Sequence, residues 1–527
     1  MAAGNPIPRV GPDGRLITIM DWKALQNGSD IRGIAMGPRA ELTPEVAHRL
    51  GRAFAAWLAR SLERAPEGLT VAVGRDSRLT GPDLMSSLMQ GLARDGLRVF
   101  DLGLASTPAM FMSTVTPGYA CDGAVMLTAS HLPPDRNGCK FFTRQGGLNR
   151  DDVSVLLELA ESGDFLSAPG TGAIMPVDFM TVYARQLVER IRNGVAHPEH
   201  PERPLQGLRI VVDAGNGAAG FFVDRVLQPL GADTTGSQYL EPDGTFPNHV
   251  PNPEHPDAMA ALTQAVTAQR VDFGIVFDPD VDRAAAVDSD GRAINRNRLV
   301  ALAAAMVLRE HPGSTVVTDS ITSDGLTDFI ERDLGGVHRR FKRGYRNVIN
   351  EALRLNAAGQ ECWLAIETSG HAALKENHFL DDGAYLMAML LIELARARRE
   401  GRSLGTLIAT LREPAESAEI RIGNDDRDFR TSGNQVIDAL RARAGVEPDW
   451  KVVPDNYEGV RVACRGAGER GWFLLRLSLH DPVLALNIES ETPGGAGRIA
   501  HRLLPLLQGF DALELSALET AAKGPSG

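Results

Sequence analysis

Short apolar segments that end in polar loops recur along this chain, and they constrain its fold more than any other feature. Three of them lead into Thr-Ala-Ser-His (128–131), Asp-Pro-Asp-Val-Asp-Arg (278–283) and Glu-Thr-Ser-Gly-His (367–371). Longer segments with helical periodicity lie between them, an alternation typical of βαβ units in layered α/β domains. Open α/β sheets bind ligands beyond the carboxyl ends of their strands. The pattern therefore predicts α/β domains with polar side chains gathered at sheet edges.

The apolar segments also predict the order of strands and domains. Strands are expected at residues 69–73, 123–127, 208–212, 273–277, 315–318, 363–366, 418–422, 471–477 and 484–488. A chain of 527 residues has room for several domains of roughly 100 to 200 residues each. We expect an N-terminal extension at residues 1–28, three α/β domains at 29–175, 176–305 and 306–414, and a C-terminal domain at 415–527.

Composition narrows the class of protein. The formal net charge is -12, from 55 basic and 67 acidic residues, and no run of five like charges occurs. This balance argues against broad binding to nucleic acid or to membrane surfaces. The four cysteines form no C-x-x-C pair, and no stretch reaches the ~18 apolar residues of a membrane span. These features predict a cytoplasmic enzyme.

The first polar loop carries a candidate nucleophile. Residues 128–140 read Thr-Ala-Ser-His-Leu-Pro-Pro-Asp-Arg-Asn-Gly-Cys-Lys, directly after the apolar run 123–127. A serine hydroxyl is a weak nucleophile until neighbouring groups manage its proton and the charge of the transferred group. His131 and Lys140 are the candidate neighbours of Ser130 for this purpose.

The second loop has the composition of a metal site. Asp278, Asp280 and Asp282 alternate just beyond a predicted strand, with no His or Cys nearby, and such oxygen ligands suit a hard cation such as Mg²⁺. An EF-hand would need glycine at the sixth position and glutamate at the twelfth, where this chain has Arg283 and Ser289. A solvated acidic turn is the other interpretation, and the adjacent arginine argues against it.

Two further motifs suit ligand binding. Glu367, Ser369 and His371 follow a predicted strand and can hydrogen-bond neighbouring hydroxyl groups of a ligand. Arg476 and Ser478 follow another strand, where a guanidinium can hold a phosphate bidentately and a hydroxyl can bind its remaining oxygens.

In this order, the four motifs resemble those of the α-D-phosphohexomutases, the phosphoglucomutase and phosphomannomutase superfamily. That superfamily has T-A-S-H-N-P with N-G-x-K, D-G-D-x-D-R, G-E-x-S-G-H and R-x-S-x-T-E-P. This chain departs from it at Leu132, Pro279, His480 and Asp481. Smaller matches at residues 29–33, 74–78, 106–108, 213–217 and 344–347 extend the resemblance over most of the chain.

The resemblance implies a four-domain architecture, with three related mixed α/β domains and a smaller α+β C-terminal domain around a central cleft. It implies that Ser130 is a phosphoserine and ligates Mg²⁺ together with Asp278, Asp280 and Asp282. The catalytic group implied with them is His131, Lys140, Arg32 and Arg283. The implied substrate-binding residues are Glu367, Ser369, His371, Arg346, Arg476, Ser478 and His480.

The implied reaction interconverts hexose 1-phosphate and hexose 6-phosphate, with glucose and mannose as the first candidates. It proceeds through a hexose 1,6-bisphosphate, which also serves as activator, and the implied assembly is a monomer or homodimer. His131, His371 and Lys140 stay open as general acid or base. Three alternatives also stay open: a hexose bisphosphate synthase, an aspartyl phosphatase of the haloacid-dehalogenase type, and a noncatalytic sugar-phosphate-binding protein.

Overall fold

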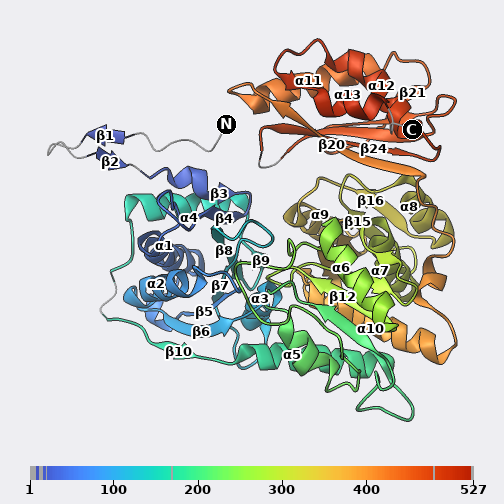
Figure 1. Ribbon diagram of the computed structural model, residues 1–527. Helices are drawn as coiled ribbons and strands as arrows, with labels where there is room; N and C mark the ends of the chain where they lie inside the picture. Colours follow the sequence, from blue (N-terminus) through green and yellow to red (C-terminus); the bar gives the residue numbers. More distant parts are fainter. Residues whose placement is uncertain (1–7, 11–15, 19, 168–169, 479–480, 524–527) are drawn as a thin grey trace. The chain divides into compact units, whose positions relative to one another are not determined.

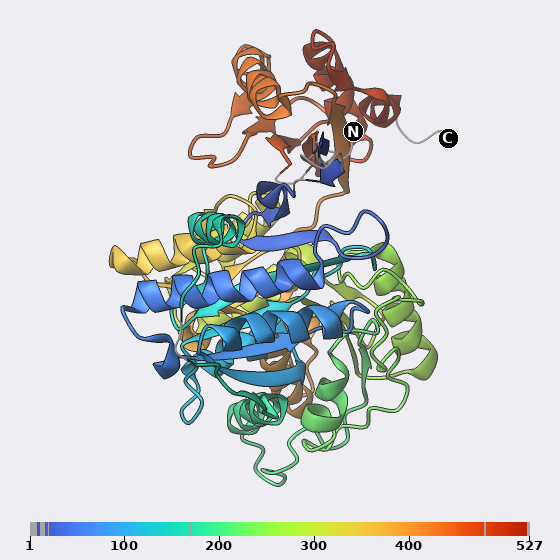
Figure 2. The same ribbon diagram turned by 90° about the vertical axis from the view of Figure 1, so that its left-hand side faces the viewer.

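The computed structural model describes most of the chain, and its described part forms two compact units. The described residues are 8–10, 16–18, 20–167, 170–478 and 481–523. The first unit contains residues 1–299 and 369–406, and the second contains 300–368 and 407–527. Each unit is described by itself below, and Figures 1 and 2 show the elements.

The first unit begins with a mixed sheet. Its strands are β3 (Gln26–Asn27), β4 (Asp30–Ile34), β5 (Thr70–Arg75), β6 (Arg98–Leu104), β7 (Gly123–Leu127), β8 (Arg136–Thr143), β9 (Gly146–Gly147) and β10 (Ile174–Pro176). They lie in the order β10-β6-β5-β7-β8-β4-β3, with β9 paired to β8. The pairs from β10 to β7 are parallel and those from β7 to β3 are antiparallel. The carboxyl ends of β5 and β7 therefore meet at one edge, where Ser130 follows.

Helices cover both faces of this sheet. They are α1 (Pro44–Leu62), α2 (Gly81–Arg94), α3 (Thr107–Val115), α4 (Arg150–Ser162) and α5 (Phe179–Val195). Helix α1 packs against α2 and α4, and Figure 2 shows α1 and α2 side by side. Alternate strand residues such as Val71, Val73 and Val125 join these helices in one apolar core, whereas α3 contacts β5, β7 and β8. Trp22 and Leu25, placed by the sequence in an extension, belong to this core.

A second sheet in the same unit positions the acidic loop. Its strands are β11 (Ile210–Asp213), β12 (Phe273–Phe277), β13 (Ala284–Asp288) and β14 (Ala293–Ile294), in that order. Strands β11 and β12 are parallel, and β12 returns into antiparallel β13 through residues 278–283. Helix α6 (Pro256–Gln269) packs on this sheet. The hairpin β18 (Ala372–Leu374) and β19 (Leu380–Asp381) leads into α10 (Gly383–Arg399), which contacts β13 and α5.

The second unit contains two sheets. Strands β16 (Val337–Arg340), β15 (Thr315–Thr318) and β17 (Cys362–Ile366) are parallel in that order, accompanied by α8 (Asp324–Asp328) and α9 (Tyr345–Ala357). An antiparallel sheet follows, in the order β21 (Trp450–Val452), β22 (Val460–Cys464), β23 (Gly471–Leu477), β24 (Val483–Ser490), β20 (Glu416–Asn424), β25 (Leu513–Glu514). The helices α11 (Phe429–Ala444), α12 (Gly495–Leu507) and α13 (Ser516–Lys523) lie over this sheet (Figure 1). Their apolar side chains belong to its core. Helix α7 (Arg296–Glu310) begins in the first unit and ends in the second.

The structure agrees with the predicted class of fold. Every predicted strand overlaps an observed one, and four of them, β7, β12, β15 and β23, have the predicted bounds. The domain boundaries stay predictions. The four cysteines are buried, and none of them is part of a disulfide. In the described part of the chain, no helix has the length and hydropathy of a membrane span.

Candidate active site

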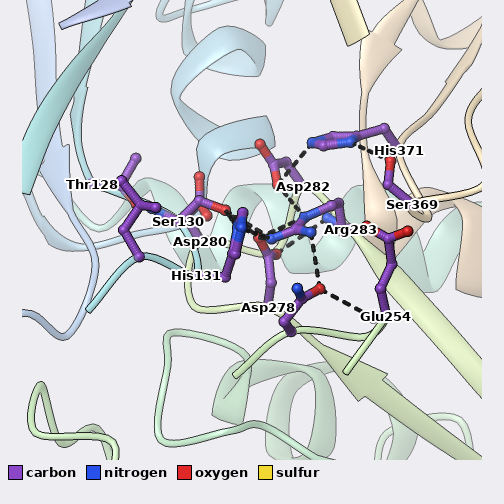
Figure 3. Close-up of polar contacts among 12 residues, drawn as sticks. Thr128, Ser130, His131, Glu254, Asp278, Asp280, Asp282, Arg283, Ser369 and His371 are labelled. Carbon is purple, nitrogen blue, oxygen red and sulfur yellow. Dashed lines mark hydrogen bonds and ion pairs between the residues drawn. The ribbon is translucent and has the colours of Figure 1, made fainter. Parts of the chain in front are cut away.

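Ser130 lies in the loop between β7 and β8, with a left-handed backbone at φ +51°. Such a φ is uncommon for a residue other than glycine, and it recurs where surrounding contacts impose it at functional sites. The side chain is buried, and Oγ lies 2.9 Å from Asp278 Oδ2, 3.0 Å from Arg283 Nη2 and 3.3 Å from His131 Nδ1 (Figure 3). The hydroxyl is thus aimed at the acidic loop, although the two segments are far apart in sequence.

The three aspartates converge in the turn between β12 and β13. Val281 adopts φ +66°, which lets the chain reverse within a few residues. Asp278, Asp280 and Asp282 are all buried, and a carboxylate oxygen from each lies within 4.8 Å of the others. Asp280 Oδ1 and Asp282 Oδ1 accept no hydrogen bond from the described residues. Buried carboxylate oxygens of this kind are costly unless a cation offsets them, so this oxygen-only set fits a hard divalent ion.

Neighbours fix the other oxygens of the acidic loop. Thr107, at the start of α3, donates its hydroxyl to Asp280 Oδ2 at 2.5 Å and its amide to the Asp280 carbonyl at 2.8 Å. Lys140, on β8, forms a hydrogen-bonded ion pair with Asp282 Oδ2 and lies 3.5 Å from Asp280 Oδ2. Asp280 and Asp282 therefore each have one oxygen occupied and one available. Both oxygens of Asp278 accept hydrogen bonds, Oδ1 from the Arg283 amide at 3.2 Å and Oδ2 from Ser130 Oγ at 2.9 Å.

The charges in this cluster are unevenly placed. Burial, together with the neighbouring Asp282 and Asp280, raises the pKa of Asp278. Burial alone would also raise the pKa of Asp282, but Lys140, His371 and Arg283 lower it below the usual range. Burial and the acidic neighbours thus outweigh the Arg283 guanidinium, whose Nη2 lies 3.1 Å from Asp278 Oδ2, in setting the direction of the Asp278 pKa shift. A divalent cation there would favour the ionised carboxylate.

Arg283 connects the serine to this cluster. Its Nε donates to Asp278 Oδ2 at 3.2 Å, its Nη1 to Asn252 Oδ1 at 3.0 Å and its Nη2 to His131 Nδ1 at 2.6 Å. Burial and the charges of Arg283 and Arg32 lower the pKa of His131 to about 2. His131 is therefore neutral near pH 7, with Nδ1 as an acceptor.

His371 approaches the acidic loop from the segment before β18. It forms an isolated β-bridge with Arg283, and its Nδ1 lies 2.9 Å from Ser369 Oγ. Its Nε2 lies 3.7 Å from Asp282 Oδ1 and 3.6 Å from Asp381 Oδ2. Ser369 and His371 thus join the aspartates in the first unit (Figure 3).

Arg32 lies on β4, directly opposite Gly138 of the adjacent strand β8. Its Nη2 donates to Asp30 Oδ2 at 3.0 Å, so in this structure the guanidinium pairs with a neighbouring carboxylate. Its charge contributes to the lowered pKa of His131, which places it electrostatically close to the serine loop.

The remaining predicted residues belong to the second unit. Glu367 accepts the amide of Gly344 at 2.6 Å, just before Arg346 in the first turn of α9. Glu458 Oε2 accepts the Arg343 amide at 3.1 Å, while its Oε1 lies 4.0 Å from Arg476 Nη1.

Arg476 is buried near the end of β23, and Ser478 Oγ accepts the Asp481 amide at 3.3 Å. The loop around Arg343 thus links the Glu367 and Arg476 motifs within one unit. His480 lies outside the described residues.

Comparison with known proteins places the chain in a family. Models of phosphoglucomutase/phosphomannomutase α/β/α domains I, II and III match residues 23–165, 185–291 and 295–414. The chain belongs to the phosphoglucomutase/phosphomannomutase family. A Neisseria gonorrhoeae phosphoglucomutase is 32% identical over 482 residues, covering 91% of this chain and 95% of that protein. A Pseudomonas aeruginosa phosphomannomutase/phosphoglucomutase is 34% identical over 474 residues, covering 89% and 92%.

A solved structure extends this likeness to the fold. A family protein from Burkholderia thailandensis is 29% identical, with a TM-score of 0.75 over 96% of this chain and 99% of its own. The predicted superfamily and fold class, three α/β domains and a further β-rich C-terminal domain, are confirmed. The predicted enzyme class is confirmed as well: the chain is a hexose phosphate mutase, an isomerase-class phosphotransferase. The family is metal-dependent, consistent with the acidic cluster.

The structure adds residues to which the sequence gave no role. Thr107 lies in the Ser-Thr-Pro match at 106–108, and Asp76 and Arg78 lie in the match at 74–78. Thr107 contacts Asp280, while Asp76 and Arg78 contact the serine loop. The family resemblance marked these segments. Which side chain of each segment reaches the site is determined by packing between distant segments, which the sequence alone does not show.

Proposed function

We propose that this family member interconverts the 1- and 6-phosphates of glucose and mannose through a phosphorylated Ser130 and a hexose 1,6-bisphosphate. The observation that carries the proposal is the position of Ser130 Oγ, 2.9 Å from Asp278 and 3.0 Å from Arg283 inside a buried acidic cluster. A phosphoryl group on Oγ would be adjacent to both the guanidinium and the carboxylates that would hold the cation.

The first half of the cycle transfers the phosphoryl group to the sugar. The free hydroxyl of a hexose phosphate attacks phosphorus, so that one P–O bond forms as the bond to Ser130 Oγ breaks. The product is a hexose 1,6-bisphosphate and an unmodified serine. Phosphoryl transfer of this kind depends mainly on alignment and on electrostatic stabilisation of the transferring group.

Asp278, Asp280 and Asp282 would hold Mg²⁺, which when bound supplies positive charge against the transferring phosphoryl oxygens. Arg283 contributes a fixed guanidinium 3.0 Å from Oγ. Lys140 is held against Asp282 and Asp280, which orients the acidic loop and adds a second positive charge.

Protons must move in each half of the cycle. The attacking sugar hydroxyl loses a proton, and Ser130 Oγ takes one when its bond to phosphorus breaks. We assign the first role to His371, because the imidazolium formed would lie beside Asp282 and Asp381. His131 is neutral and accepts from Arg283, which suits a residue that positions Ser130 rather than a proton donor.

The second half returns the other phosphoryl group to Ser130. The bisphosphate must present its second phosphate to the serine, whose hydroxyl attacks it and releases the isomeric hexose phosphate. In the second unit, Arg476 and Ser478 are assigned to the phosphate that is not reacting, with Glu367 and Arg346 assigned to the sugar. Hexose 1,6-bisphosphate would also phosphorylate resting enzyme, which accounts for its predicted role as activator. A cytoplasmic location and a monomeric or homodimeric state stay predictions.

A time course tests this proposal directly. The purified protein is incubated with Mg²⁺, trace glucose 1,6-bisphosphate and either glucose 1-phosphate or mannose 1-phosphate, and phosphorylated sugars are followed by ³¹P NMR. We expect the 6-phosphate of both sugars to appear. Release of inorganic phosphate alone, or no change with either sugar, would contradict the proposal, and accumulation of bisphosphate would indicate a bisphosphate synthase.

A further inference from the structure

A fully buried arginine lies beneath the Ser130 loop. Arg78 follows β5 and precedes α2, and its side chain has no exposed surface. Its guanidinium carbon lies 5.2 Å from the centre of the Phe246 ring, which covers it from another segment of the same unit. Arginine is rarely buried this completely unless its donors are satisfied, so each donor needs an account.

Four of the donors are directed at one loop. Nη2 donates to the carbonyls of Ser130 at 2.5 Å and Leu132 at 2.6 Å. Nη1 donates to the carbonyls of Pro133 at 2.7 Å and Arg136 at 2.8 Å. One guanidinium thus holds four carbonyls across the loop, which contains the residue that would carry the phosphoryl group.

Asp76 joins this arginine to the backbone of the serine. Its Oδ2 lies 3.4 Å from Arg78 Nε and accepts the Thr128 hydroxyl at 2.7 Å, while its Oδ1 accepts the Arg78 amide at 2.9 Å. Thr128 Oγ1 in turn accepts the Ser130 amide at 2.8 Å. The amide and the carbonyl of Ser130 are therefore both fixed by the same buried group of residues, Asp76, Arg78 and Thr128.

This arrangement explains how the serine keeps its unusual backbone. A left-handed φ in a residue other than glycine costs of order 1 kcal/mol, so surrounding contacts must impose it. The planar guanidinium fork suits four carbonyls at once. A lysine ammonium has three donors and no such fork. Charge-assisted hydrogen bonds to the carbonyls are also stronger than neutral ones.

We infer that Arg78 is a positioning residue for the phosphoryl-transfer reaction. Together with Asp76 and Thr128 it holds the Ser130 loop in the one backbone conformation that directs Oγ at Asp278 and Arg283. This inference rests on the proposed function of Ser130. It assigns Arg78 no contact with substrate, so its effect belongs to the rate of transfer and not to sugar-phosphate affinity.

The test compares two lysine substitutions that both keep the positive charge. For Arg78→Lys we expect kcat to fall about 100-fold, because a misplacement of ~1 Å at the reacting atom has an effect of this size. KM for the sugar phosphate should stay within about twofold, since uniform binding is untouched. Ser130 should be phosphorylated by glucose 1,6-bisphosphate to the same final extent as in the unmodified chain, but more slowly.

Arg49→Lys is the matched control. Arg49 also donates to backbone carbonyls of the same unit, those of Ala160 and Glu161, on a helix remote from the serine loop. It should keep the kcat of the unmodified chain. An equal loss of kcat in both lysine variants, or an unchanged kcat in Arg78→Lys, would overturn the inference.

Thr128 provides a second test should Arg78→Lys fail to fold. Thr128→Val removes the hydroxyl that joins Asp76 to the Ser130 amide, whereas Thr128→Ser keeps it. We expect kcat to fall in the valine variant and to be restored in the serine variant. Equal kcat in both variants would overturn the inference. If the unmodified chain itself showed no mutase turnover, that result would instead overturn the proposed function.

Discussion

At the scale of single residues, Asp280 and Asp282 each have one oxygen held by a protein group and one without a hydrogen bond from the described residues. Asp280 illustrates the arrangement: Thr107 holds Oδ2 at 2.5 Å, and Oδ1 is buried without a hydrogen bond from the described residues. Substitution of a residue that orients a metal ligand typically lowers metal affinity or activity by about 10- to 100-fold. Thr107 should therefore control how tightly Mg²⁺ binds.

Thr107→Val tests this role. We expect the Kd for Mg²⁺, measured by direct titration calorimetry, to rise about tenfold, the lower end of the effect typical of such residues. Thr114→Val is the control, because Thr114 lies on the same helix, is also buried, and its hydroxyl donates to the Phe111 carbonyl at 2.7 Å. Equal Mg²⁺ affinity in both variants would show that Thr107 does not position Asp280.

At the scale of elements, the segment that leads into α10 packs closely against the backbone of the acidic loop. The Gly383 amide donates to the Val281 carbonyl at 3.2 Å, and a Cβ at position 383 would lie 2.7 Å from the Arg283 carbonyl carbon. A Cβ at Gly370 would lie 2.6 Å from the Ala284 carbonyl oxygen. These close approaches explain why glycine is needed where the chain crosses the acidic loop.

Gly383→Ala should displace Arg283 and lower kcat at least tenfold. A tenfold fall corresponds to a rise of about 1.4 kcal/mol in the activation free energy. Gly405→Ala serves as control, since the nearest atom to a Cβ there is Ser403 Oγ at 3.7 Å. Steady-state kinetics of both variants measure the effect. A Gly383→Ala enzyme with unchanged kcat would mean that the loop tolerates a shift of its backbone.

The start of α10 also predicts a pH dependence of stability. Asp382 caps this helix through the Tyr385 amide and accepts the Tyr183 hydroxyl at 2.6 Å, yet burial raises its pKa to about 6 from 3.8. Because the folded state binds the Asp382 proton more tightly than the unfolded state does, protonation of Asp382 stabilises the fold. This stabilisation is fully present below the unfolded pKa of 3.8 and is lost as pH rises through about 6. Between pH 5 and pH 7.5 the free energy of unfolding should fall by about 1 kcal/mol from this group.

Asp382→Asn removes this titration. Thermal unfolding of the two proteins should show the melting temperature of the unmodified chain falling relative to the variant as pH rises from 5 to 7.5. A difference between the two melting temperatures that stays constant over this range would contradict the raised pKa.

The sequence predicted the positions of the strands better than it predicted which side chains contact one another. Strands β7, β12, β15 and β23 were predictable to the residue, because apolar runs bounded by Gly, Asp or polar loops leave little choice of bounds. The sequence also predicted that Ser130 and the aspartates come together, because both segments directly follow strands and because their motifs resemble those of the family. The contact of Thr107 with Asp280 depends on the packing of distant segments, which no local spacing encodes. Arg32 instead pairs with Asp30, two residues away on the same strand, a contact that the sequence motifs did not predict.

At the scale of the whole molecule, the predicted site residues are divided between the two units. The first holds the serine, the acidic loop and His371, and the second holds Arg476, Ser478 and Glu367. We assign the phosphoryl-transfer chemistry to the first unit and binding of the non-reacting phosphate to the second. Substitutions in the two units should therefore affect different kinetic constants.

Arg476→Ala should raise KM for hexose phosphates about tenfold or more, because a charge-assisted hydrogen bond contributes roughly 1.5 to 3 kcal/mol. Binding of glucose 1,6-bisphosphate should weaken as well. Arg443→Ala is the control, since Arg443 is an exposed arginine of the same unit that bonds to the Leu506 carbonyl. An unaltered KM in Arg476→Ala would remove this arginine from the phosphate site.

The most direct test of the account is to identify which residue carries the phosphoryl group. The purified protein is treated with glucose 1,6-bisphosphate and Mg²⁺, then analysed by intact and peptide mass spectrometry before and after addition of excess glucose 6-phosphate. We predict one phosphoryl group on Ser130, lost on addition of the sugar phosphate, and none in Ser130→Ala, which should also lack mutase activity. A phosphoryl group on another residue, or full turnover by Ser130→Ala, would contradict the central claim.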